Sequence, residues 1–147
     1  MMKTKSLWLG GGAVVFLAGF VLGSAVRPWD VVHAQSNQRV FELRTYTAPE
    51  GKLDALSARF RDHTVELFKK HGITSVGYFL PQDAPKSQNT FVYILAHPDR
   101  QTAQKNWAAF QADPEWRKAL AESQPQGPLQ TKVESVFINP TDYSPLK

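Results

Sequence analysis

The sequence has no cysteine among its 147 residues. This absence excludes a disulfide framework, a lipid-modified cysteine and any metal site that requires thiolate ligands. The fold must therefore be stabilised by side-chain packing alone.

Glycine is also sparse after residue 34, where it stands isolated at Gly51, Gly72, Gly77 and Gly127. Isolated glycines do not make a phosphate-binding loop, and no serine beyond that point lies in the Gly-x-Ser-x-Gly pattern of a hydrolase nucleophile. The histidines lack the spacing of a zinc-binding helix. We therefore predict no metal site and no cofactor.

Net charge is small as well. The formal charge of +4 at pH 7 falls to +2 beyond residue 34, because Lys3, Lys5, Arg27 and Asp30 all precede that point. The remaining charges are scattered along the chain, without the basic clusters that are typical of nucleic-acid-binding proteins. We expect no nucleic-acid partner.

The first 34 residues have the pattern of an export signal. Two lysines within Met1–Ser6 precede an uncharged apolar stretch, Leu7–Val26, and Val32-His33-Ala34 offers the small residues that a signal peptidase accepts. Cleavage after Ala34 would leave residues 35–147 as one periplasmic or secreted domain. Because the apolar stretch is longer than most signal cores, the alternative is a retained anchor, with the domain outside the cytoplasm and membrane contact only through this segment.

Beyond this leader the sequence alternates between strand and helix patterns. A strand-like segment, Arg39–Thr47, is followed by a helical pattern that starts after Gly51 and ends at His71, before Gly72. The segment Thr90–His97 is apolar almost throughout, which is typical of a strand buried on both faces. The other predicted elements are a strand at 73–80, a loop at 81–89, helices at 100–112 and 114–122, and a strand at 131–139.

This order predicts an α+β fold of the ferredoxin-like β-α-β-β-α-β type, with an antiparallel sheet and both helices on one face. A strand at 90–97 that is apolar on both sides also requires a cover on the other face. Because a twofold axis lets one surface complement itself, we expect a second copy to supply that cover and the pair to form a homodimeric α+β barrel.

Four stretches in residues 35–147 together resemble the motifs of the NIPSNAP family. They are Glu42–Tyr46, His71-Gly72, Trp107–Trp116 and Asn139–Pro145, and their order and spacing are more specific than any one of them. The resemblance implies a dimeric α+β barrel, near the small barrels that include cofactor-free monooxygenases and haem-handling enzymes. It implies little about chemistry, because the family has no settled reaction and a shared fold does not define a function.

The main candidate site lies on the first strand. Glu42, Arg44 and Tyr46 alternate with apolar residues and therefore share one face. We expect helices to cover the apolar face, so that the polar face meets either water or a cavity against a second sheet. In a cavity, Arg44 would bind an anionic or carbonyl group while Glu42 and Tyr46 orient it. Otherwise the three form a structural ion pair with a tyrosine beside it.

His71 is the other candidate residue. It lies on the side of its helix that can face the sheet, where it could carry a proton or bind a metal, or it could stabilise the end of the helix. The remaining histidines and aromatic residues are expected to be solvated or structural: His63, His97, Trp107, Phe110 and Trp116.

Two classes of function follow from these patterns. The first is a homodimeric module of the cell envelope that binds a small apolar or anionic ligand, or another protein. The second is a small-barrel enzyme, monooxygenase-like or haem-associated, that acts on an apolar oxygen-bearing substrate through Arg44, Tyr46 and His71. The sequence contains no activated nucleophile and no close acid and base pair, which favours the first class.

Overall fold

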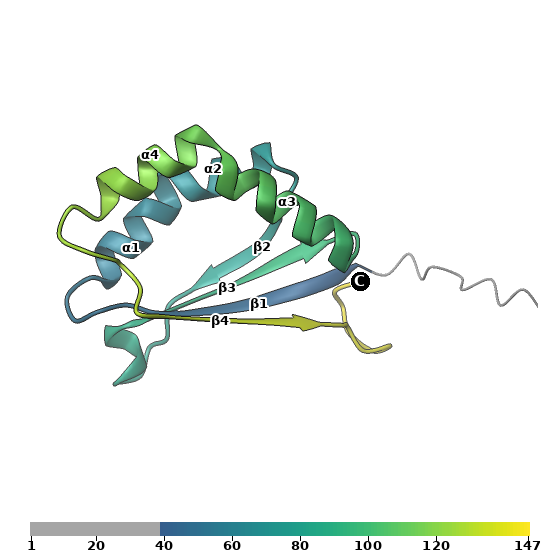
Figure 1. Ribbon diagram of the computed structural model, residues 1–147. Helices are drawn as coiled ribbons and strands as arrows, with labels where there is room; N and C mark the ends of the chain where they lie inside the picture. Colours follow the sequence, from purple (N-terminus) through teal and green to yellow (C-terminus); the bar gives the residue numbers. More distant parts are fainter. Residues whose placement is uncertain (1–38) are drawn as a thin grey trace, which may run out of the picture. The chain divides into compact units, whose positions relative to one another are not determined.

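The computed structural model describes residues 39–147, which form one four-stranded antiparallel sheet with helices against one face (Figure 1). The strands are β1 (Val40–Thr47), β2 (Thr74–Phe79), β3 (Thr90–His97) and β4 (Lys132–Ile138). The helices are α1 (Leu53–Arg59), the π-helix η1 (Phe60–Thr64), α2 (Val65–Lys70), the 3-10 turn η2 (Lys86–Gln88), α3 (Arg100–Ala112) and α4 (Pro114–Ser123).

The strand order β2-β3-β1-β4, with every neighbouring pair antiparallel, confirms the predicted ferredoxin-like α+β fold. The two central strands, β1 and β3, carry the residues that the sheet presents to the helices. The predicted export signal at residues 1–34 lies outside the described residues. Within residues 39–147, no helix is long and apolar enough to cross a membrane.

The predicted helix that ends at His71 has the expected extent, but it is not α-helical throughout. Its middle turn is a π-helix in which the Val65 N–H donates to the Phe60 carbonyl, five residues back. The Thr64 hydroxyl also donates to the Arg59 carbonyl, five residues back, at 3.2 Å. An apolar period of three to four residues continues through both helix types, so the sequence pattern does not distinguish them.

The end of α2 follows the prediction. Gly72 adopts φ +69°, a left-handed conformation that glycine accepts without steric cost. The Ile73 N–H donates to the Phe68 carbonyl at 2.9 Å and the Gly72 N–H to the Lys69 carbonyl at 3.1 Å. These bonds cap the helix and turn the chain into β2.

The core between sheet and helices is largely aromatic. The Phe60 ring lies at its centre, with ring centroids of Phe91 and Tyr93 at 4.6 and 5.0 Å and those of Tyr46 and Phe68 at 5.9 and 6.3 Å. The π-helical turn therefore places an aromatic side chain where it meets β1, β3 and α2 together.

Among the described residues no helix covers the opposite face of the sheet, which is mainly apolar. Leu43 pairs with Ile94 on one side and with Val136 on the other, so these three side chains form one row across the sheet. Val136 is 54% exposed and Phe79 is 51% exposed. The Phe79 ring folds over Gly77, where an added Cβ would lie 2.7 Å from it.

Removing the central aromatic ring should destabilise the domain. We expect Phe60→Ala to lower the free energy of unfolding by about 3 to 5 kcal/mol, because it deletes a ring that is 3% exposed and leaves a cavity. Urea denaturation measures this loss. Tyr143→Ala, at a residue that is 85% exposed, is the control and should change the free energy little. A loss below about 1 kcal/mol for Phe60→Ala would contradict this packing.

Candidate functional site

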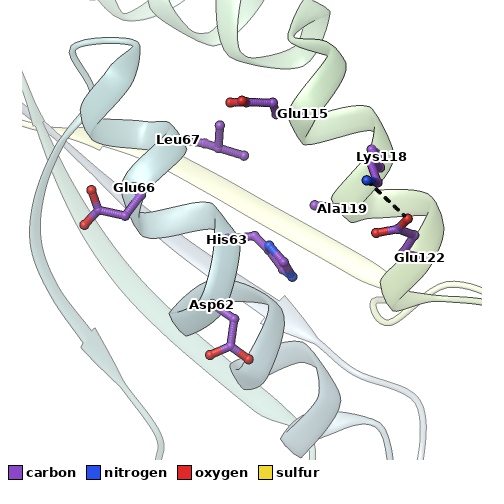
Figure 2. A pocket seen from close by; sticks show the side chains of 8 residues that line it. All are labelled: Asp62, His63, Glu66, Leu67, Glu115, Lys118, Ala119 and Glu122. Atoms are coloured by element: carbon purple, nitrogen blue, oxygen red, sulfur yellow. Dashed lines mark ion pairs between the residues drawn. The ribbon is translucent and has the colours of Figure 1, made fainter.

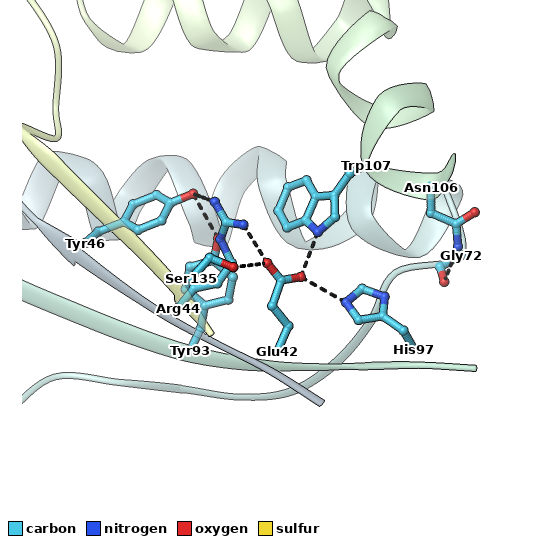
Figure 3. Close-up of polar contacts among 9 residues, drawn as sticks. All are labelled: Glu42, Arg44, Tyr46, Gly72, Tyr93, His97, Asn106, Trp107 and Ser135. Carbon is cyan, nitrogen blue, oxygen red and sulfur yellow. Dashed lines mark hydrogen bonds and ion pairs between the residues drawn. The ribbon is translucent and has the colours of Figure 1, made fainter. Parts of the chain in front are cut away.

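The polar residues of β1 face the helices, which corrects the prediction that their face would be the uncovered one. Glu42, Arg44 and Tyr46 point toward α3 and the π-helical turn, and Trp107 of α3 contacts two of them (Figure 3). The apolar set, which includes Phe41 and Leu43, lies on the other face. Alternation correctly predicted that the three share a face, but it does not indicate which face the helices cover.

Glu42 lies at the centre of a buried hydrogen-bond network and is 1% exposed. Its Oε1 accepts from Arg44 Nη1 and Ser135 Oγ, both at 2.6 Å. Its Oε2 accepts from Trp107 Nε1 at 2.8 Å and from His97 Nε2 at 3.1 Å. Because a carboxylate only accepts, the proton on the His97 ring must lie on Nε2 in this bond.

These donors determine the charge of Glu42. Burial by itself would raise the pKa of the carboxyl group, but the hydrogen bonds from His97, Ser135, Trp107 and Arg44 outweigh burial and lower the pKa from 4.5 to about 2. Glu42 is therefore a carboxylate at neutral pH, and it joins β1 to β3, β4 and α3.

Arg44 is held in one place by this network. Its Nη1 pairs with Glu42, its Nη2 donates to the Tyr46 hydroxyl at 3.3 Å, and its guanidinium carbon lies 4.4 Å from the centroid of the Trp107 ring. The Nε atom is buried without an acceptor. The Arg44 side chain is 16% exposed. It lies beside Ser135 of the edge strand β4, which is also exposed.

Tyr93 extends the network on β3. Its hydroxyl donates to the Tyr46 hydroxyl at 2.9 Å, and the residue is fully buried. Burial raises the pKa of Tyr93 well above 10, so the phenol stays neutral and remains a donor.

A small cavity of about 30 Å³ adjoins this network between the sheet and the helices. Two of its lining residues, Tyr46 and Trp107, also contact Arg44. The full lining is Tyr46, Arg59, Phe60, Thr64, Phe68, Trp107, Phe110, Trp116 and Gln130.

A larger hollow of about 360 Å³ lies elsewhere, on the outer surface between the π-helical turn, α2 and α4 (Figure 2). Its charged side chains are exposed to solvent, and Lys118 and Glu122 are 3.9 Å apart across one turn of α4. Charges in water interact weakly with one another and with a ligand. We therefore place the candidate site at the buried network, although its cavity is the smaller one.

His71 does not join Glu42, Arg44 and Tyr46. Its Nε2–H donates to Asp113 Oδ2 at 2.6 Å, and its ring packs against Phe110. Hydrogen bonds from His71 and Lys70 lower the pKa of Asp113 despite some desolvation. Asp113 also accepts from the Glu115 N–H at 2.7 Å and so caps α4. His71 thus joins the end of α2 to the start of α4.

Five residues of this region were not predicted as site residues. The signal that could have identified two of them is strand register, because β1 and β3 pair antiparallel and Tyr93 and His97 share the face of Glu42. The uninterrupted apolar run of β3 hides that parity in the sequence. The five residues of the site that were not predicted are Arg59, Tyr93, His97, Trp107 and Ser135.

Within residues 39–147, no group of three histidine or acidic side chains is placed to hold a metal ion. The buried network instead provides fixed hydrogen-bond donors, one guanidinium and several aromatic rings. Such a set can orient a small polar or anionic molecule, and it needs no group from outside the chain to do so.

Comparison with known proteins gives consistent results. Residues 41–145 match the NIPSNAP family model. A NIPSNAP family protein of unknown function (Atu4242) from Agrobacterium tumefaciens is 27% identical, with a TM-score of 0.66 over 76% of this chain and 96% of that one. An uncharacterised NIPSNAP-like domain protein from Burkholderia xenovorans is 19% identical, with a TM-score of 0.65 over 74% and 90%.

A more distant similarity concerns the fold alone. The ActVA-Orf6 monooxygenase of Streptomyces coelicolor, solved in complex with nanaomycin D, is 15% identical, with a TM-score of 0.51 over 74% of this chain and 92% of that one. A comparison with curated protein sequences gave no match.

The buried carboxylate makes a testable contribution to stability. Because the pKa of Glu42 is lowered on folding, its ionised form stabilises the fold above pH 4.5, and this contribution is lost as the pH falls from 4.5 toward 2. We expect Glu42→Gln to lower the free energy of unfolding at pH 7 by about 3 kcal/mol, with the difference from the parent shrinking as the pH falls through that window. Urea denaturation followed by tryptophan fluorescence measures both.

Glu134→Gln is the matched control, since Glu134 is an exposed glutamate on β4 that pairs with Lys132 at 2.9 Å. It should change stability by less than about 1 kcal/mol at either pH. If the free energy of unfolding changed with pH in the same way in the parent and in Glu42→Gln, Glu42 would not be the carboxylate whose ionisation stabilises the fold.

Proposed function

The chain belongs to the NIPSNAP family, and we propose that its domain is a homodimeric module that binds a small ligand. The ligand site would lie on the helix-covered face of the sheet, where the aromatic cavity meets Arg44. The observation that carries this proposal is that the Arg44 guanidinium is held by Glu42 and contacts Tyr46 and Trp107, two residues that line that cavity. A charged group with a fixed position loses little conformational freedom when it binds a ligand.

Binding is favoured over catalysis by the state of the polar groups. Glu42 already accepts four hydrogen bonds and Tyr93 is a neutral donor, so neither is prepared to take a proton from a substrate. Arg44 keeps a free Nε–H and part of its surface. Arg44, a positively charged hydrogen-bond donor, is therefore the group best suited to contact a ligand.

An oxygenase-like enzyme is a second candidate. In its favour are the shared fold with the ActVA-Orf6 monooxygenase and a hydrogen-bonded chain in which the Tyr46 hydroxyl accepts from both the Tyr93 hydroxyl and Arg44 Nη2. Such a chain can orient an oxygen-bearing substrate and donate a hydrogen bond to it. Oxygen uptake on addition of an apolar oxygen-bearing substrate such as a polycyclic phenol, lost in Tyr46→Phe, would favour this candidate over simple binding.

The homodimer would form through the open apolar face of the sheet. Leu43, Ile94 and Val136 cross that face in one row, and the exposed Phe79 ring lies close to Gly77 beside it. A large exposed apolar surface on a small domain marks an interaction site. A second copy is the occupant that matches it, because the surface has few charges and a twofold axis can pair it with itself.

The localisation that we propose rests on the first 34 residues of the sequence. Their lysines and apolar stretch support export, with the domain periplasmic or secreted after cleavage, or held outside the cytoplasm by a retained anchor.

The ligand proposal predicts that a small molecule remains with the protein through purification. Native mass spectrometry of the protein as isolated from cells should detect it, and Arg44→Gln should lose it, because the amide lacks the charge and the fork of donors. Arg100→Gln is the matched control, since Arg100 is an exposed arginine that also stacks on a ring, 4.6 Å from the centroid of Phe137. Equal retention in Arg44→Gln and the parent would exclude Arg44 as the ligand contact.

The dimer proposal predicts that a charge on the open face separates the copies. We expect Val136→Asp to convert a dimer into a monomer at micromolar concentration in sedimentation velocity, because it would bury an unpaired carboxylate at the interface. The control Val133→Asp makes the same change on the same strand, at a residue that is 43% exposed and lies on the other face of the sheet. A parent chain that sediments as a monomer would refute the dimer.

A further inference from the structure

Arg59 is a buried cation, and no carboxylate of residues 39–147 forms an ion pair with it. The residue is 2% exposed, and its Nη1 and Nη2 atoms donate to the side-chain oxygens of Gln124 and Gln130 at 3.4 and 2.8 Å. Its Nε atom is buried without an acceptor. By contrast, Arg44, the other arginine of this interior, has the Glu42 carboxylate 2.6 Å away.

A charge in this position is costly unless something neutralises it. Two amide oxygens satisfy hydrogen bonds, but they carry no net charge, and burial lowers the pKa of Arg59. Isolated ionised groups in protein interiors are normally paired with an opposite charge for this reason. Within residues 39–147, Arg59 therefore has amide acceptors but no carboxylate that balances its charge.

The space for a balancing anion is the cavity described above. Arg59 lines it together with Thr64, Gln130, Tyr46 and Trp116, and none of its lining residues is acidic. Its volume of about 30 Å³ is room for one or two small groups and not for a whole aromatic molecule. The π-helical turn starts directly after Arg59 and places Phe60 and Thr64 at the same cavity, and such turns are frequent at functional sites.

We propose that the cavity at Arg59 binds a small monoanion, which is either a free ion such as chloride or formate or the carboxylate end of a larger ligand. The anion accepts from Arg59 Nε–H and lies among the edges of the surrounding aromatic rings. This inference rests on the proposed ligand cavity and adds the charge and size of the group that enters it.

The test compares thermal unfolding and calorimetric binding of the full chain with chloride, formate and benzoate. Sodium sulfate keeps the ionic strength constant, since this dianion is too large for the cavity. Chloride and formate should raise the melting temperature of the parent, because an anion that binds only the folded state stabilises it. Arg59→Gln should weaken binding by roughly tenfold or more, as expected for the loss of a charged hydrogen bond. Arg100→Gln should leave binding unchanged.

A second variant keeps the test valid if Arg59→Gln does not fold. Gln130→Glu places a carboxylate beside Arg59 from within the chain, so it should raise the melting temperature in the absence of added anion and abolish the response to formate. Gln126→Glu is its control, because Gln126 accepts from Lys52 at 3.3 Å and does not line the cavity at Arg59. This variant should keep the response of the parent.

The three anions identify the source of the charge. Benzoate that binds at least tenfold more tightly than formate would assign the site to the end of a larger ligand, whereas equal binding of chloride and formate would assign it to a free ion. A parent that responds to none of the three, or a response that persists in Arg59→Gln and Gln130→Glu, would overturn the inference and leave water as the occupant.

These results are separable from those for the proposed function. If a retained molecule depends on Arg44 but no anion binds at Arg59, only the anion inference fails. If the anion binds but the parent retains no molecule, the ligand-binding function fails while the anion site stands.

Discussion

The structure depends on one buried carboxylate. Glu42 can lie inside the protein as an anion only because Arg44, Ser135, His97 and Trp107 all donate to it. Those donors come from β1, β4, β3 and α3, so one group connects most of the sheet to the helix above it. The cost of leaving any donor or acceptor in this network unpaired makes its arrangement specific.

The two faces of the sheet differ in the side chains that they carry. The helix-covered face holds the buried hydrogen-bond network and the aromatic cavity, whereas the open face is mainly apolar around Leu43, Ile94 and Val136 and has the exposed Lys132–Glu134 pair at one end. Small domains more often keep polar groups on the outside. The reversal here is consistent with a ligand site inside each protomer and with a second copy on the outer face.

The two interior arginines differ in a way that matters for function. The charge of Arg44 is balanced by Glu42, so this residue is positioned to donate hydrogen bonds without needing an anion. Arg59 has only amide partners and an unused Nε–H, so its charge is not balanced within the described residues. Arg59 lines the cavity itself, whereas Arg44 only contacts two of its lining residues, Tyr46 and Trp107.

The sequence alone determined the order of the elements, the ferredoxin-like class and the fact that Glu42, Arg44 and Tyr46 share a face, because these follow from local periodicity. Only the tertiary structure decided that this face lies under the helices, that His97 and Trp107 meet Glu42, and that Arg59 reaches the cavity. Those contacts join residues far apart in the chain, and they depend on strand register and on the π-helical turn. The apolar sequence of β3 does not alternate, so it does not indicate which of its side chains face the helices. The apolar period of the first helical segment likewise does not reveal its π-helical turn.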